Sequence, residues 1–114
     1  MRIYSVGYNI LYTPGFEKQL KKLCKKYKSL PSDLSGLVVE LKENPFIGIS
    51  LGNNCFKIRL AIKSKGKGKS GGARVITYVV VRDEEVYLIT IYDKSAQDTV
   101  SEKELHQLTR QVKK

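Results

Sequence analysis

The sequence is poor in the residues on which most catalytic and metal sites depend. Its 114 residues include two cysteines, one histidine and no tryptophan. A single histidine excludes catalysis by a histidine pair and leaves too few imidazole and thiolate groups for most zinc sites. Cys24 and Cys55 lie among apolar neighbours without CxxC spacing, so we expect reduced core thiols rather than a disulfide. Any chemistry must use lysine, arginine, tyrosine or a carboxylate, and no cofactor is expected.

Long hydrophobic runs are also missing. No apolar run approaches the roughly 18 residues of a membrane span. The segment from Met1 to Tyr12 lacks the charged start and the cleavage site of a signal peptide. With 41% hydrophobic and 28% charged residues, the composition is that of an ordinary globular protein. We therefore expect one domain over residues 1–114, in the cytoplasm and without a membrane partner.

Acidic residues are scarce, and the basic residues are clustered. Against 11 Asp and Glu stand 21 Lys and Arg, which gives a net charge of +10 and predicts a polyanionic partner. No acidic residue interrupts the stretch from Lys57 to Arg74, whose seven basic residues are Lys57, Arg59, Lys63, Lys65, Lys67, Lys69 and Arg74. We favour phosphate contact over a solubilising loop there, because the charge has one sign and continues into strand residues.

The first half of the chain predicts a strand followed by a helical hairpin. Residues 8–12 are a short β-rich run, after which Thr13 and Pro14 suit the cap and the first position of a helix. Apolar residues then recur at helical spacing at Phe16, Leu20, Leu23, Cys24 and Tyr27. A second helix follows residues 29–33 and ends at Asn44 and Pro45, with Leu34, Leu37, Val38 and Leu41 on its apolar side. The lysines of the first helix indicate a solvated face, with contact to a long polyanion as the alternative.

The second half predicts strands and a last helix. From Cys55 the period is two, with Phe56, Ile58, Leu60 and Ile62 on one face and Lys57, Arg59, Ala61 and Lys63 on the other. Residues 63–72 read as a flexible loop, and residues 73–82 and 86–92 as a hairpin with an acidic tip at 83–85. Ser101 and Glu104 form a capping box for a helix that carries Leu105, Leu108 and Val112.

This order of elements predicts an α+β fold. The N-terminal strand and helical hairpin pack on a twisted, mainly antiparallel β-sheet, and a C-terminal helix follows. If the helices cover one face of the sheet, Lys57, Arg59 and Arg74 gather on the other face. That surface is the candidate site. Tyr92 lies at the end of a strand beside Lys94, where core packing is the commoner role and base stacking or proton transfer is the alternative.

Three segments resemble the RelE/ParE superfamily of toxins from type II toxin-antitoxin modules. They are Lys57 to Ala61, Gly66 to Ile76 and Tyr87 to Ser95, and they are most similar to the RelE/HigB-like branch. The Gly-Lys-Ser-Gly-Gly-x-Arg stretch at residues 68–74 is the most specific part. The resemblance covers most of the chain from Tyr8 onward.

The resemblance implies a small, metal-independent endoribonuclease that enters the ribosomal A site and cuts messenger RNA. It also implies a cognate antitoxin that wraps the toxin and masks its basic groove. By position, Lys57 and Arg59 match the family's first basic pair, Arg74 matches the arginine that opens the next strand, and Lys94 matches a basic residue after the last strand. Some members carry a catalytic tyrosine or histidine near the C-terminus, whereas this chain ends Gln111-Val112-Lys113-Lys114, so the resemblance itself assigns no general base.

Cleavage by the ribose 2′-hydroxyl needs a base, an acid for the leaving oxygen and cations for the phosphorane. We assign Arg59 and Arg74 to the phosphorane, Lys94 to the leaving oxygen and Lys57 to the base, and we keep Tyr92 as a further catalytic candidate. Contacts to messenger and ribosomal RNA are expected from Lys63, Lys65, Lys67, Lys69, Lys22, Lys25 and Lys26. A ParE-like inhibitor of DNA gyrase and a non-catalytic RNA-binding module are the alternative functions.

Overall fold

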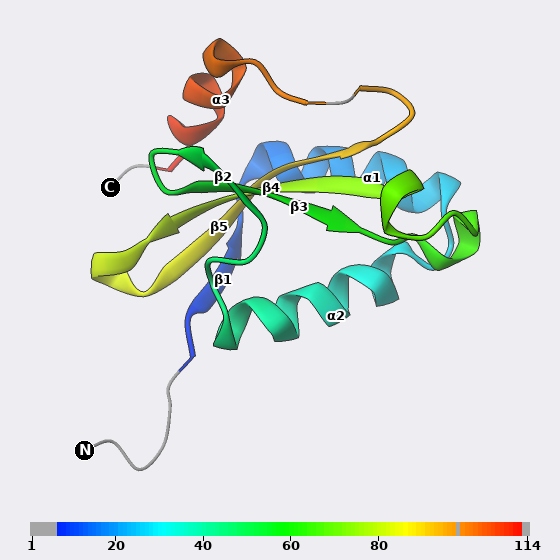
Figure 1. Ribbon diagram of the computed structural model, residues 1–114, viewed down its shortest axis with the longest axis horizontal. Helices are drawn as coiled ribbons and strands as arrows, with labels where there is room; N and C mark the ends of the chain where they lie inside the picture. Colours follow the sequence, from blue (N-terminus) through cyan, green and yellow to red (C-terminus); the bar gives the residue numbers. More distant parts are fainter. Residues whose placement is uncertain (1–6, 98, 113–114) are drawn as a thin grey trace.

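The structure, a computed structural model, describes residues 7–97 and 99–112 (Figure 1). The domain predicted over residues 1–114 therefore includes positions at both ends, and Asp98, that lie outside the described residues. A five-stranded sheet with the order β1-β5-β4-β3-β2 forms the middle of the molecule. Its strands are β1 (Asn9–Tyr12), β2 (Ile49–Gly52), β3 (Cys55–Leu60), β4 (Ala73–Val80) and β5 (Glu85–Asp93).

Most neighbouring strands of the sheet are antiparallel, as predicted. The exception is β1, which pairs parallel to β5. Strand β2 was not predicted, and it joins β3 through Asn53 and Asn54, whose φ angles are 53° and 61°. Positive φ at both central residues is what a two-residue hairpin turn requires, and asparagine tolerates it better than most residues. A β-hairpin with such a short first strand leaves little periodic signal in the sequence.

The helical hairpin forms as the sequence predicts. Helix α1 (Pro14–Lys26) begins after Thr13, whose hydroxyl oxygen accepts a hydrogen bond from the backbone of Phe16 at 3.2 Å. Helix α2 (Leu30–Glu43) follows after a short connection. Apolar residues from both helices pack with one face of the sheet in a first core, in which Phe16, Leu30 and Leu41 are fully buried.

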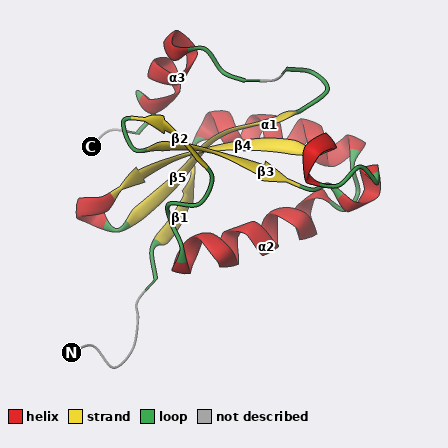
Figure 2. Ribbon diagram, in the orientation of Figure 1, coloured by secondary structure: helices red, strands yellow, loops and turns green. Residues whose placement is uncertain are grey.

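The last helix, α3 (Glu102–Thr109), packs against a second core on the other face of the sheet. Figure 2 shows α3 and α2 on opposite sides of the strands. The expectation of helices on a single face is therefore right for the hairpin and wrong for α3. The reason is that Cys55, Ile76 and Ile89 make part of the second face apolar, and Leu105 of α3 covers them. The predicted cap is present, because Ser101 accepts a hydrogen bond from the backbone of Glu104 at 3.0 Å.

Both cysteines are free thiols, as expected. Cys55 is buried, and burial raises the pKa of its thiol to about 11, which makes it a poor nucleophile. Cys24 is only partly buried. Within residues 7–97 and 99–112, no helix has the length and apolar character needed to cross a membrane.

Candidate functional site

The predicted strand cations come together where β3, β4 and β5 lie side by side. Arg59 is paired with Arg74 across β3 and β4, and Arg74 is paired with Tyr92 across β4 and β5. Residues paired in this way project from the same face of a sheet. Lys57 lies two residues before Arg59 on β3 and therefore shares that face. One face of the sheet thus carries four predicted site residues, Lys57, Arg59, Arg74 and Tyr92, and we call the three basic ones the cation group.

Lys94 borders this group at the end of β5. Its backbone N–H donates to the carbonyl oxygen of Gly72 at 3.0 Å, which fixes it beside the start of β4. The site residues differ in exposure: Arg59 is exposed and Lys57 and Lys94 are half-buried, whereas Arg74 and Tyr92 are 4% and 7% exposed. Direct contact with a large polyanion is therefore easiest for Arg59.

Arg74 binds the basic loop, residues 63–72, that precedes it in the sequence. Its Nη1 donates to the carbonyl oxygens of Lys69 and Ala73 at 3.0 and 3.1 Å, and its Nη2 donates to that of Ser70 at 3.1 Å. The loop passes so close to β3 that a Cβ on Gly72 would lie 2.1 Å from the carbonyl oxygen of Leu60. The Gly-Lys-Ser-Gly-Gly-x-Arg stretch thus has a structural explanation, since glycine permits the close approach and arginine binds the loop carbonyls.

The basic loop is more ordered than predicted. Residues 63–72 contain two short 3-10 turns, Lys63–Lys65 and Lys69–Gly71. The start of the loop is bound to the helical hairpin, because the backbone N–H of Lys63 donates to Asp33 Oδ2 at 3.1 Å. The backbone N–H of Ser64 also donates to Ser29 Oγ at 2.8 Å. The expectation of a flexible loop is therefore wrong at these anchored positions.

The basic loop has a third anchor, besides Arg74 and the Asp33–Ser29 pair. Its centre is a buried carboxylate that the sequence did not reveal. Asp93 is 5% exposed and lies between the candidate residues Tyr92 and Lys94. Its side chain accepts hydrogen bonds from Tyr27 Oη at 2.5 Å, Lys65 Nζ at 2.6 Å and Ser95 Oγ at 2.8 Å. This network joins the end of α1, the basic loop and the end of β5.

The network determines the charge states of its members. Burial alone raises the pKa of the Asp93 carboxyl, but the hydrogen bonds from Lys65, Tyr27 and Ser95 outweigh burial and hold that pKa well below its usual range. The hydrogen bond to Asp93 is the main reason why the pKa of Tyr27 is raised above 10.0, with burial adding to it. Asp93 is therefore a carboxylate at neutral pH, and Tyr27 is its neutral hydrogen-bond donor.

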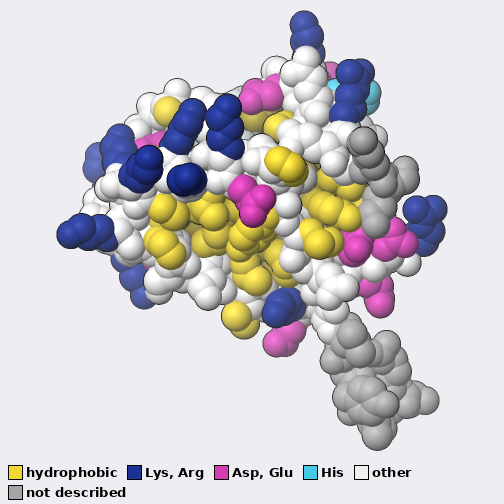
Figure 3. Space-filling view, turned by 180° about the vertical axis from the view of Figure 1, so that it is seen from behind, with side chains coloured by type: hydrophobic (Ala, Val, Ile, Leu, Met, Phe, Trp, Pro, Cys, Tyr) yellow, Lys and Arg dark blue, Asp and Glu magenta, His cyan; other side chains and the backbone are white. Residues whose placement is uncertain are grey.

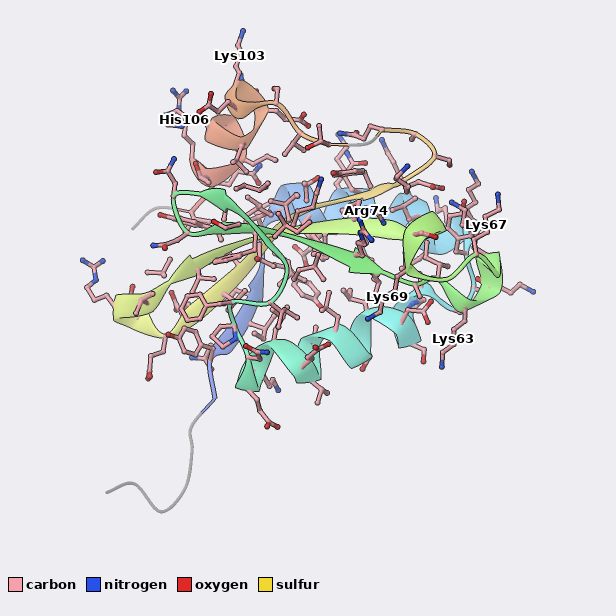
Figure 4. All side chains as sticks on the ribbon, viewed as in Figure 1. Lys63, Lys67, Lys69, Arg74, Lys103 and His106 are labelled. Carbon is pink, nitrogen blue, oxygen red and sulfur yellow. The ribbon has the colours of Figure 1, made fainter. Side chains whose placement is uncertain are left out.

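The lysines predicted to contact RNA have different environments. Lys65 is engaged with Asp93, and its side chain is 12% exposed. Lys63, Lys67 and Lys69 are exposed, and Figure 4 shows Lys63 and Lys67 pointing away from the body of the molecule. The α1 residues Lys22, Lys25 and Lys26 are also exposed. Seen from behind, Lys and Arg side chains lie along the border of a face whose middle is apolar (Figure 3).

A cavity of about 690 Å³ opens between β3 and α2, next to the cation group. Its walls include apolar residues such as Leu37 and Leu60, and also Lys57 and Arg59. In the part of the chain that the structure describes, no cluster of three or more histidine, cysteine or acidic side chains is placed to hold a metal ion. The site therefore combines exposed cations, an ordered basic loop and a partly apolar hollow.

Solved toxin structures have the same fold. A mutant of E. coli toxin RelE in the free state has a TM-score of 0.62 at 18% identity, over 95% of this chain and 100% of that chain. The toxin in the intact E. coli RelBE toxin-antitoxin complex gives 0.58 at 22% identity, over 75% and 95%. The toxin-antitoxin complex RelBE2 from Mycobacterium tuberculosis gives 0.55 at 14% identity, over 79% and 94%.

The sequence itself matches a protein family over residues 16–114. That family is described as the RelE toxin of the RelE / RelB toxin-antitoxin system. The matched segment contains most of α1 and all of α2, the cation group, the basic loop and α3. Since the match extends over most of the chain, the protein belongs to the RelE toxin family.

Proposed function

We propose that this toxin is a metal-independent endoribonuclease that cleaves messenger RNA in the ribosomal A site and so inhibits translation. The observation that carries the proposal is the row of Arg59, Arg74 and Tyr92 across three adjacent strands, with Lys57 and Lys94 at its borders. Attack by a ribose 2′-hydroxyl builds negative charge on the phosphorane, and fixed cationic donors stabilise that charge. Arginine suits this role because its planar fork binds two phosphate oxygens at once.

The differences in exposure favour different roles for Arg59 and Arg74. Arg59 is exposed and contacts the scissile phosphate, whereas Arg74 is buried and acts by holding the basic loop in place. Lys57 lies two residues from Arg59 and is the proposed general base. Lys94 is the proposed donor to the leaving oxygen. Tyr92 stays a candidate through its hydroxyl group, since its ring packs in the second core.

The proposed partners follow from the surface and from the relatives. Exposed lysines of α1 and of the basic loop are the proposed contacts to the phosphates of messenger and ribosomal RNA, and the proposed location is the cytoplasm, where ribosomes work. A cognate antitoxin is the second proposed partner, because the similar E. coli and M. tuberculosis toxins were solved as toxin-antitoxin complexes. An antitoxin that covers the cation group would block RNA cleavage.

Primer extension on messenger RNA after induced expression tests this function. We expect discrete new 5′ ends at codon positions with the wild type and their loss with Arg59→Ala. Arg82→Ala is the matched control, because Arg82 is an exposed arginine at the far tip of the β4–β5 hairpin. Intact message with stalled replication would indicate a gyrase inhibitor instead. Intact message without a replication defect would indicate a non-catalytic RNA-binding module.

A further inference from the structure

Hydrogen bonds to Asp93 form the turn that carries Lys94. Strand β5 ends at Asp93, and Lys94 follows directly. The carbonyl oxygen of Asp93 accepts hydrogen bonds from the backbone N–H groups of Ala96 and Gln97 at 2.9 and 3.3 Å. Its Oδ1 accepts from the backbone N–H and the hydroxyl group of Ser95 at 3.0 and 2.8 Å. An aspartate bound to the backbone two residues later forms an Asx turn, which restricts the residue between them.

Other parts of the chain hold the carboxylate of Asp93 in place. Its Oδ1 also accepts a hydrogen bond from Lys65 Nζ at 2.6 Å, and its Oδ2 accepts one from Tyr27 Oη at 2.5 Å. Lys65 belongs to the basic loop and Tyr27 directly follows α1, so both donors come from segments distant from β5 in the sequence. Asp93 is 5% exposed and protein donors bind both of its oxygens. It can therefore orient its neighbours but not bind a substrate.

Alternation along β5 places Lys94 on the face of the cation group. Asp93 points towards the helical hairpin, because it bonds to Tyr27 at the end of α1. Tyr92, one residue earlier, packs in the second core on the opposite face. The pairing with β4 continues past Asp93, since the backbone N–H of Lys94 donates to the carbonyl oxygen of Gly72. Lys94 therefore projects to the same side as Tyr92.

A lysine needs such support in order to act as a proton donor. Its ammonium group lies at the end of a flexible four-carbon stem. A general acid must come within hydrogen-bond reach of the atom that it protonates, about 3 Å. A fixed backbone at Lys94 restricts the volume that the ammonium group can occupy. A loosened turn enlarges that volume and lowers the fraction of time in which proton transfer is possible.

We propose that Asp93 is a positioning residue for Lys94, the proposed acid. The inference rests on the proposed function, because it concerns the leaving oxygen. In that step the ribose 2′-oxygen forms a bond to phosphorus and its proton goes to the proposed base, Lys57. The bond from phosphorus to the 5′-oxygen breaks, its electron pair stays on that oxygen, and the Lys94 ammonium group gives it a proton. Tyr27 and Lys65 act on this step only through Asp93.

The test compares two leaving groups in single-turnover cleavage of ribosome-bound message by saturating amounts of the full chain. One message has the natural 5′-oxygen at the scissile bond, located by primer extension, and the other has sulfur in its place. A thiol ionises at about pH 8.5, far below an alcohol, so sulfur leaves without a proton. Lys94→Met should slow cleavage of the oxygen message at least about 100-fold and of the sulfur message less than about threefold.

The network is tested by removing its buried ion pair as a whole. Asp93→Ala combined with Lys65→Met leaves no unpaired buried charge, and circular dichroism checks that this variant is folded. It should slow cleavage of the oxygen message at least about tenfold and leave the sulfur message nearly unchanged. Tyr27→Phe removes one donor to Asp93 and keeps both charges, so it should show the same pattern at a smaller size.

The matched control removes an ion pair at the far tip of the β4–β5 hairpin. Asp83→Ala combined with Arg82→Met deletes a surface pair whose charged atoms are 3.6 Å apart. Both messages should then be cleaved at the wild-type rate.

The outcomes separate this inference from the function on which it rests. If the Asp93 and Lys65 double variant slows both messages equally, or slows neither, Asp93 does not position the acid and the inference is overturned. Equal slowing of both messages by Lys94→Met would show that Lys94 is not the acid, and the inference would fail with it. In each case cleavage by the wild type still supports the proposed function, which fails only if the wild type cleaves neither message. If the double variant does not fold, Tyr27→Phe decides by the same comparison.

Discussion

Replacing the buried carboxylate Asp93 measures how much its ion pair with Lys65 contributes to the free energy of unfolding. Asp93→Asn keeps the shape of the side chain but removes the charge that compensates Lys65. In the wild type the two side chains are only 6% and 12% exposed and their charged atoms are 2.6 Å apart. Removing one partner of a fully buried pair costs about 3–5 kcal/mol. Since asparagine can still accept the hydrogen bond from Tyr27, we expect a loss of about 2–4 kcal/mol in the free energy of unfolding.

Urea denaturation followed by far-UV circular dichroism at pH 7 measures this loss. Asp83→Asn is the matched control, because Asp83 pairs with Arg82 at 3.6 Å on the surface, with side chains 33% and 77% exposed. An exposed pair of this kind is worth about 1 kcal/mol or less. Equal losses in the two variants would show that Asp93 does not stabilise the fold through a buried ion pair.

The pH dependence gives a second check. The folded-state pKa of Asp93 lies below its usual value of 3.8, so its stabilisation is fully present above the unfolded-state pKa and is lost as the pH falls towards the folded-state pKa. The stability difference between wild type and Asp93→Asn should therefore be constant from about pH 8 to pH 5 and should narrow below about pH 4. A difference that grows on acidification would contradict the assigned charge state.

Two further predictions concern the basic loop and α1. Arg74→Gln removes the guanidinium that binds the loop carbonyls, so trypsin should cut after Lys67 or Lys69 several-fold faster than in the wild type, as mass spectrometry of early fragments would show. Unchanged cleavage would mean that other contacts hold the loop. Changing Lys22, Lys25 and Lys26 together to glutamine should weaken co-sedimentation with ribosomes. The slope of the logarithm of the binding constant against the logarithm of the salt concentration should become shallower by roughly 2. An unchanged slope would indicate that this face of α1 is merely solvated.

Local rules predicted much of the fold. Thr13 and Ser101 are helix caps because their hydroxyl groups accept hydrogen bonds from nearby backbone amides, and such short-range contacts leave a recognisable pattern. The alternation from Cys55 to Leu60 likewise predicted which residues of β3 face the core. Strand β2 and the position of α3 escaped prediction. Both depend on contacts between distant parts of the chain, which periodicity does not report.

The sequence also predicted some features of the candidate site and missed others. Alternation along β3 and β4 predicted that Arg59 and Arg74 share a face, and the strand register agrees. Alternation could not predict that Arg74 is buried, because burial depends on the loop folding back over it. The Asp93 network was missed because its partners Tyr27 and Lys65 come from segments far apart in the sequence.

The three anchors of the basic loop bear on the entropy of the proposed RNA binding. A free lysine-rich segment would lose backbone freedom when it ordered against phosphates, at about 1–2 kcal/mol per residue. Here Arg74, Asp93 and the Asp33–Ser29 pair have already restricted the segment during folding. Much of the ordering cost is thus met before any RNA arrives, and the lysines lose mainly side-chain freedom on binding. In the proposed function, loop anchoring thereby converts folding stability into affinity for RNA.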